Sequence, residues 1–134
     1  MIETIKYKKK IYGIIIRNQF KLKSNNIKFF TPSNFSQQLG YMHRPKGYKI
    51  TPHKHKQNIR KVFHTQEILF LKKGLVKVNF YHQSKKFYKS KMLKQGDIIL
   101  LAFGGHGFEM LKSSELYEVK QGPYSQSKDK IIFG

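Results

Sequence analysis

Hydrophobic and polar residues alternate along much of this chain with the period of two that is typical of β-strands. The clearest example is the segment 75–81, where Val76, Val78 and Phe80 fall on one face and the residues between them on the other. No stretch keeps apolar residues at helical spacing for three turns. The pattern therefore predicts short strands at residues 12–17, 27–31, 66–71, 75–81, 87–93, 98–103, 106–111 and 116–120.

Glycines mark the turns between these strands. Gly74 lies between the segments 66–71 and 75–81, which predicts a β-hairpin with glycine in its loop. Further turns are expected at Gly96 and at Gly104 with Gly105. Short strands at regular spacing, with turn signals between them, indicate an all-β sandwich or barrel with little or no helix.

Length and composition are those of one ordinary domain. The chain has 134 residues, of which 39% are hydrophobic, and this is enough to form a real core. The absence of cysteine excludes disulfides and thiolate metal sites. The apolar segment 11–16 is too short for a membrane helix or a signal peptide. We therefore expect a soluble, cytoplasmic protein formed by a single domain over residues 1–134.

The net charge of +20 raises the question of nucleic-acid binding, since lysine and arginine neutralise phosphates. Only 3 of the 27 basic residues are arginine, however, and the lysines are spread along the whole chain. Specific base readout and bidentate phosphate contacts favour arginine. The interpretation we prefer is a lysine-rich solvated surface, with nucleic acid as the less favoured partner.

Four residues carry candidate metal chemistry. His53 and His55 are two apart, so in a strand their imidazoles would project from the same face. Glu67 shares a face with Leu69 and would be costly to bury without a partner. His106 follows the Gly-Gly turn. Such a mixed nitrogen and oxygen set suits a divalent transition metal such as Fe, Mn, Ni or Zn better than Mg or Ca.

These residues resemble the two motifs of the cupin family. The first, G-x5-H-x-H followed by E-x6-G, is matched by Gly47, His53 and His55, then by Glu67 and Gly74. Eleven residues separate His55 from Glu67, where cupins usually have three or four, which predicts an insertion there.

The second cupin motif, G-x5-P-x-G-x2-H-x3-N, is matched less closely. Gly96 and Gly104 fit the pattern, Ala102 replaces the proline, His106 comes one residue early and Met110 replaces the asparagine. The resemblance covers residues 47–120. It implies a jelly-roll β-barrel whose metal ligands are His53, His55, Glu67 and His106.

The cupin resemblance also bears on the remaining segments. Small cupins are often homodimers, and residues 1–40 are expected to add strands to the main sheet or to a partner subunit. The segment 118–124 is loosely similar to cupins of surface-polysaccharide and sugar-nucleotide pathways. Glu118, Lys120 and Tyr124 are thus candidate substrate-binding residues, although Glu118 and Lys120 could instead form a surface ion pair. Arg60 could clamp an anionic substrate, or it could be a solvated loop residue.

Two main functions fit these expectations. The first is a metal-binding cupin acting on a small molecule, in particular a carbohydrate or sugar derivative, by isomerase or epimerase chemistry, with dioxygenase chemistry also compatible with the ligand set. The second is a non-catalytic barrel that binds or senses a ligand. The sequence identifies no catalytic residue for the first function.

Overall fold

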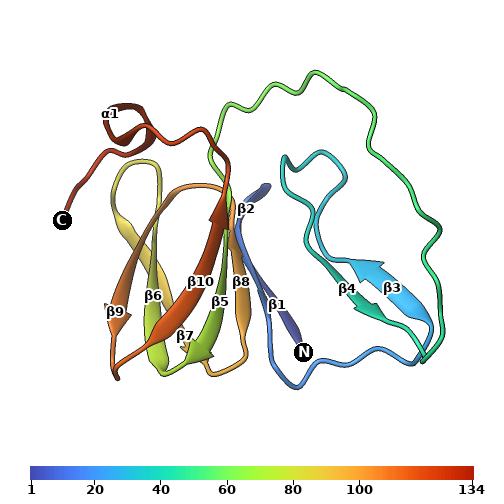
Figure 1. Ribbon diagram of the computed structural model, residues 1–134. Helices are drawn as coiled ribbons and strands as arrows, with labels where there is room; N and C mark the ends of the chain where they lie inside the picture. Colours follow the sequence, from blue (N-terminus) through green and yellow to red (C-terminus); the bar gives the residue numbers. More distant parts are fainter. The chain divides into compact units, whose positions relative to one another are not determined.

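The computed structural model describes residues 1–134, apart from the side chain of Gln126, and is nearly all β, as the sequence predicts (Figure 1). Every strand pair is antiparallel. Among the described residues no helix is long and apolar enough to cross a membrane. The elements are β1 (Ile2–Tyr7), β2 (Lys10–Ile16), β3 (Asn26–Phe29), β4 (Gly40–His43), β5 (Glu67–Lys73), β6 (Leu75–Tyr81), β7 (Phe87–Lys94), β8 (Ile98–Leu101), β9 (Gly105–Met110), β10 (Glu115–Lys120) and α1 (Gln126–Asp129).

All eight predicted strands are present, and two strands were missed. β1 was hidden by the basic run that follows it, in which Lys8 takes a left-handed turn conformation with φ of 53°. β4 is only four residues long and starts with glycine, so its pattern carries little signal. The chain divides into two compact units. We call residues Met1–Phe20 with His64–Gly134 the main unit, and Lys21–Phe63 the inserted unit.

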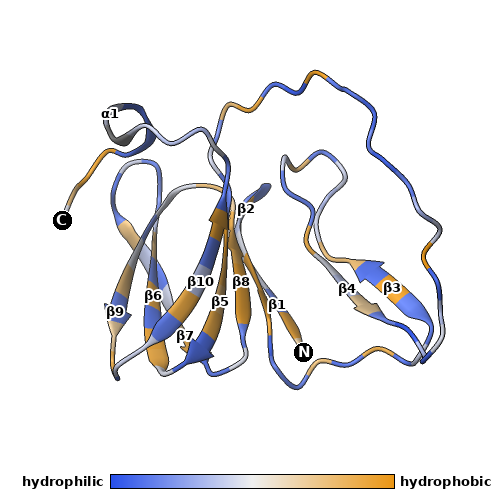
Figure 2. Cartoon of the chain, viewed as in Figure 1, coloured by the Kyte–Doolittle hydropathy of each residue, from blue (hydrophilic) through white to orange (hydrophobic). Residues whose placement is uncertain are grey.

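The main unit consists of two sheets that share one hydrophobic core. Its five-stranded sheet has the order β1-β2-β8-β5-β10 and its three-stranded sheet the order β7-β6-β9. Figure 2 shows apolar residues concentrated on the central strands of both sheets. Leu71 and Ile99 from the first sheet and Val78 and Phe80 from the second are fully buried in the same cluster. Burying such side chains provides the main driving force for this architecture.

The predicted hairpin of residues 66–81 is wrong. β5 pairs with β8 and β10, whereas β6 pairs with β7 and β9, so the chain passes from one sheet to the other at Gly74. Gly74 has φ of 116°, and a Cβ there would collide with Ser114. Each strand buries one face, and the corner at Gly74 lets these faces enter the common core from opposite sheets.

The N-terminal strands join the main sheet, one of the two outcomes expected for this segment. β2 pairs with β8 through Gly13 to Ile16, and β1 covers the edge of β2. At the end of β2, Arg17 Nη1 donates to Asp97 Oδ2 at 2.8 Å and to the carbonyl of Met92 at 2.6 Å. Asp97 also accepts from the backbone N–H of Asn18. These bonds fix the N-terminal segment to the turn between β7 and β8.

The inserted unit has one hairpin, β3–β4, and otherwise consists of loops. Gly40 approaches the ring of Phe29 so closely that a Cβ there would lie 2.8 Å from it. Loop contacts add order, since His43 Nδ1 lies 2.7 Å from the carbonyl of Leu22 and the Arg44 guanidinium stacks 4.5 Å from the Tyr48 ring. All four residues of β3 are exposed, so local polar contacts rather than a deep core stabilise this unit.

Candidate functional site

The main unit brings Glu67 and His106 together. Glu67 is the first residue of β5, on the same face as buried Leu69, and His106 lies on β9 in the opposite sheet. The His106 Nε2 and Glu67 Oε2 atoms are 3.8 Å apart, with side-chain exposures of 29% and 13%. The expectation that Glu67 lies among core residues is therefore confirmed. Two groups from distant parts of the sequence meet at one end of the core.

Glu118 and Lys120 lie on the same face as Glu67. In the β5–β10 register, Lys120 is directly opposite Glu67 and Glu118 is opposite Leu69, and directly opposed residues project to the same side of a sheet. Lys120 Nζ lies 3.8 Å from Glu118 Oε1 and 5.0 Å from the centroid of the Tyr124 ring. Of the two arrangements expected for Glu118 and Lys120, the structure contains the ion pair.

The surroundings change the acid–base behaviour of this pair. Burial, repulsion from the Glu118 carboxylate and a hydrogen bond with it raise the pKa of Glu67, while Lys120 and Lys130 act in the opposite direction. Burial and the nearby Lys130 lower the pKa of His106, which Glu118 partly opposes. At neutral pH the imidazole of His106 is therefore uncharged, with a ring nitrogen free to accept a proton or bind a cation.

Glu67 and His106 fit a divalent cation as two of its ligands. The carboxylate oxygen and the imidazole nitrogen are the donor types that transition metals take, and a cation would compensate the crowding of Glu67 against Glu118. Within the described part of the chain, no group of three or more histidine and acidic side chains is arranged to hold a metal ion. The main unit thus offers two donors.

His53 and His55 lie in the inserted unit, so the four predicted ligands are divided between the two units. Residues 44–66 form no strand, so the strand geometry that would place both imidazoles on one face is absent. The two rings nevertheless lie side by side, with centroids 5.4 Å apart, and both residues are exposed. His53 Nδ1 lies 2.9 Å from the carbonyl of Thr51. If Nδ1 donates there, Nε2 keeps its lone pair for a ligand.

The other histidines have structural contacts. His64 packs against Phe103 with ring centroids 6.0 Å apart, and His82 Nδ1 lies 2.7 Å from the hydroxyl of Tyr12. His82 is half-buried against the rings of Tyr7, Tyr12 and Tyr88. The sequence signal for this cluster was the recurrence of tyrosines near strand ends.

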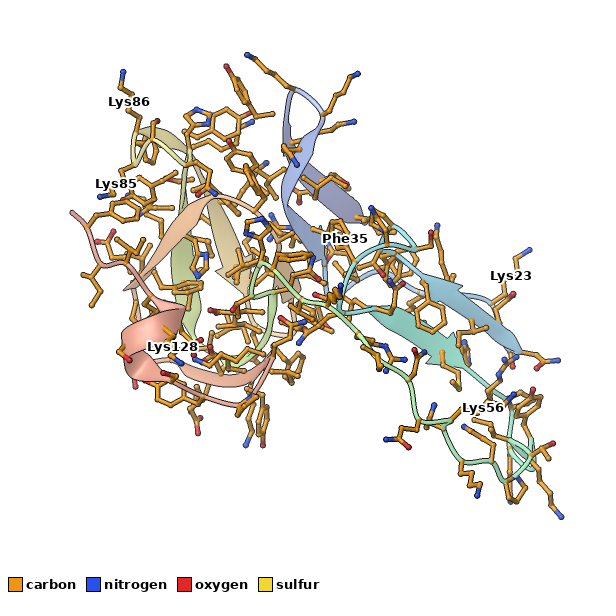
Figure 3. All side chains as sticks on the ribbon, turned by 90° about the horizontal axis from the view of Figure 1, so that it is seen from above. Lys23, Phe35, Lys56, Lys85, Lys86 and Lys128 are labelled. Atoms are coloured by element: carbon orange, nitrogen blue, oxygen red, sulfur yellow. The ribbon has the colours of Figure 1, made fainter. Side chains whose placement is uncertain are left out.

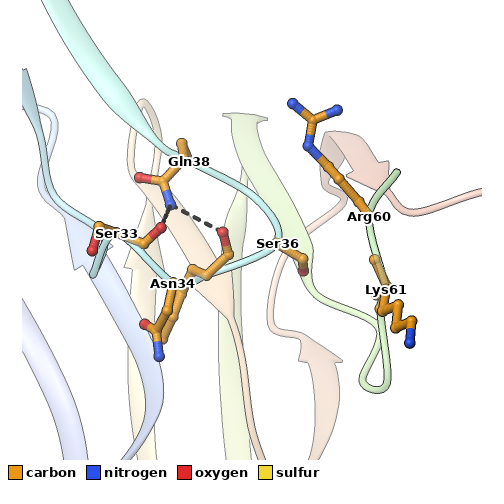
Figure 4. Close-up of a pocket in the computed structure, with 8 residues that line it drawn as sticks. Ser33, Asn34, Ser36, Gln38, Arg60 and Lys61 are labelled. Carbon is orange, nitrogen blue, oxygen red and sulfur yellow. Dashed lines mark hydrogen bonds between the residues drawn. The ribbon is translucent and has the colours of Figure 1, made fainter. Parts of the chain in front are cut away.

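Arg60 lies on a groove of the inserted unit with a volume of about 680 Å³ (Figure 4). The groove is formed by two segments of that unit, and its lining residues are Ser33, Asn34, Phe35, Ser36, Gln38, Arg60, Lys61 and Val62. Arg60 is a candidate from the sequence, whereas Lys61 and the polar loop 33–38 are not. The cluster of serine, asparagine and glutamine between Pro32 and Gly40 was the available signal.

Comparisons with protein-family models, with curated proteins and with solved structures found no match to this chain.

Proposed function

We propose that this protein is a metal-binding cupin that acts on a small molecule, in particular a carbohydrate or sugar derivative. The observation that carries the proposal is the Glu67–His106 contact, because these two residues come from separate cupin-like motifs and meet within 3.8 Å. A match to either motif alone would not require the Glu67 and His106 side chains to lie close together.

The strand connections support a jelly roll as the specific form of the all-β fold. β5 and β6 follow each other in the chain and lie in different sheets. On one side, β5 pairs with β10 and β6 pairs with β9. On the other side, β5 pairs with β8 and β6 pairs with β7. Nested pairing of this kind, with successive strands changing sheet, is typical of double-sheet jelly rolls. The proposal assigns the cupin form to this arrangement.

Glu67 and His106 would hold the metal in the main unit, with His53 and His55 as the further candidate ligands from the sequence resemblance. When bound, the metal would supply Lewis-acid polarisation of a substrate carbonyl or hydroxyl. Around it, Lys120 can donate a hydrogen bond to a substrate oxygen, and the exposed ring of Tyr124 offers an apolar surface to a sugar.

Glu118 is the candidate general base. Its side chain is 45% exposed, so it can reach a substrate that lies over Glu67 and Lys120. In an isomerisation, the Glu118 carboxylate would take the proton from the carbon beside a sugar carbonyl. The C–H electron pair would then form a C=C bond while the carbonyl π pair moves onto its oxygen, which gives an enediolate. The proton of the neighbouring hydroxyl would pass to that oxygen. As the neighbouring C=O bond forms, the C=C pair would take the first proton back from Glu118 at the former carbonyl carbon.

Metal analysis of protein purified without chelators tests the proposal. We expect about one transition-metal ion per chain in the parent, and none after Glu67→Ala or His106→Ala. His53→Ala and His55→Ala would show whether these residues also bind the ion. Glu109→Ala is the matched control, since this glutamate lies on β9 with 58% exposure and pairs with Lys77. A parent without metal, or equal loss in the control, would contradict the assignment.

A further inference from the structure

The inserted unit has a one-sided charge. Ten of the 27 basic residues lie between Lys21 and Phe63, and none of the seven acidic residues does. Figure 3 shows the side chains of Lys23 and Lys56 extending away from the ribbon of this unit. A segment in which no carboxylate neutralises the cations produces a positive potential over its whole surface, and this attracts anions. The uneven division becomes visible only once the structure separates the two units.

The groove gives this potential a specific location. Arg60 and Lys61 line one side of it and form no ion pair within the described part of the chain. Ser33 and Asn34 line the other side, and their side chains have no hydrogen-bond partner among the described residues. A guanidinium, an ammonium, a hydroxyl and an amide together are the donors that bind phosphate oxygens.

The loop opposite Arg60 is held in shape by Gln38. Its Nε2 donates to the carbonyls of Phe35 at 3.0 Å and Ser33 at 3.4 Å (Figure 4). It also lies 2.9 Å from the carbonyl of Pro32, and its Oε1 accepts from the hydroxyl of Thr31 at 2.8 Å. One side chain thus satisfies several backbone groups of a loop that has no regular structure. Binding a ligand there costs less conformational entropy than it would in an unsupported loop.

We propose that this groove binds a phosphate-bearing small molecule, with Arg60 and Lys61 as the phosphate ligands. The volume of about 680 Å³ lies within the ordinary range for small-molecule sites and suits a sugar phosphate or a mononucleotide. Phe35 and Val62 add an apolar wall for the rest of such a ligand. This site belongs to the inserted unit and does not depend on the metal proposed for Glu67 and His106.

Calorimetric titration of the full chain with glucose 6-phosphate, inorganic phosphate and glucose tests the proposal. We expect saturable binding of the two phosphates and none of glucose. Arg60→Gln should weaken glucose 6-phosphate binding about tenfold or more, because a charge-assisted hydrogen bond is lost. Lys23→Gln removes the same charge from an exposed position of the same unit outside the groove and should change the affinity less than about twofold.

Three results would overturn the proposal. The first is the absence of binding by either phosphate. The second is equal weakening by Arg60→Gln and Lys23→Gln, which would mean diffuse attraction to the whole unit. The third is tighter binding of oligothymidylate with increasing length, unaffected by Arg60→Gln, which would make the unit a nucleic-acid surface. Glu67→Ala should retain phosphate binding, so failure of the metal proposal remains distinguishable from failure of this one.

Discussion

Replacing Arg17 by methionine should strongly destabilise the main unit. Arg17 is 16% exposed and pairs with Asp97, whose side chain is 3% exposed, and its Nε also pairs with Glu3. The substitution keeps an unbranched apolar stem but removes the guanidinium. It leaves a buried carboxylate without its cation, with only the backbone N–H groups of Asn18 and Lys94 still bound to it. Breaking a buried pair in this way costs about 3–5 kcal/mol.

The matched control is Lys77→Met. Lys77 lies 3.6 Å from Glu109, and both side chains are well exposed, so its loss should cost about 0–1 kcal/mol. Urea denaturation followed by far-UV circular dichroism measures both free energies of unfolding, since the chain has no tryptophan. Equal destabilisation by the two substitutions would refute the role given to burial.

The pH dependence of stability checks the same network. The hydrogen bond with Arg17, more than that with Lys91, lowers the pKa of Glu3 from 4.5 to about 2, although burial acts in the opposite direction. Because the folded-state pKa lies below the unfolded one, this stabilisation is complete above pH 4.5 and is lost as the pH falls towards 2. Its size is about 1–3 kcal/mol, with allowance for the partial exposure of Glu3. Arg17→Met should flatten this part of the curve, and an unchanged slope would show that Arg17 is not the cause.

Three further predictions concern the corner, the site and the assembly. Gly74→Ala should lower the stability by about 1–3 kcal/mol in thermal melts, because φ of 116° and contact with Ser114 disfavour a Cβ. Gly122 has open space around it, so Gly122→Ala should have a much smaller effect. Glu118→Gln should retain the metal but abolish exchange of solvent deuterium into a bound sugar, as followed by NMR. Exchange that persists in the variant would exclude Glu118 as the base. If the parent protein binds the sugar without exchange, the non-catalytic binding module is favoured. Gel filtration at high salt should give a dimer, and a clean monomer would contradict that expectation.

The sequence by itself determined the local structure and the types of donor at the candidate site. Alternation of apolar residues is a property of each strand, so residues 75–81 could be placed without knowledge of any partner. Glu67 and His106 could be chosen because carboxylate and imidazole groups carry their chemistry in any fold. The all-β class followed from many such local signals together.

Only the tertiary structure decided which strands pair and which candidates meet. Gly74 indicates a change of direction whether the chain forms a hairpin or a corner. The choice between the two depends on whether β5 and β6 pair with each other or with strands of different sheets. The contact of Glu67 with His106 depends on β5 and β9 lying in facing sheets, and the long-range pairing that places them there leaves no trace in local pattern. The separation of His53 and His55 into an acid-free unit likewise came from the chain's contacts. Sequence periodicity reports the environment of one strand at a time, whereas a site made from several strands is a property of their packing.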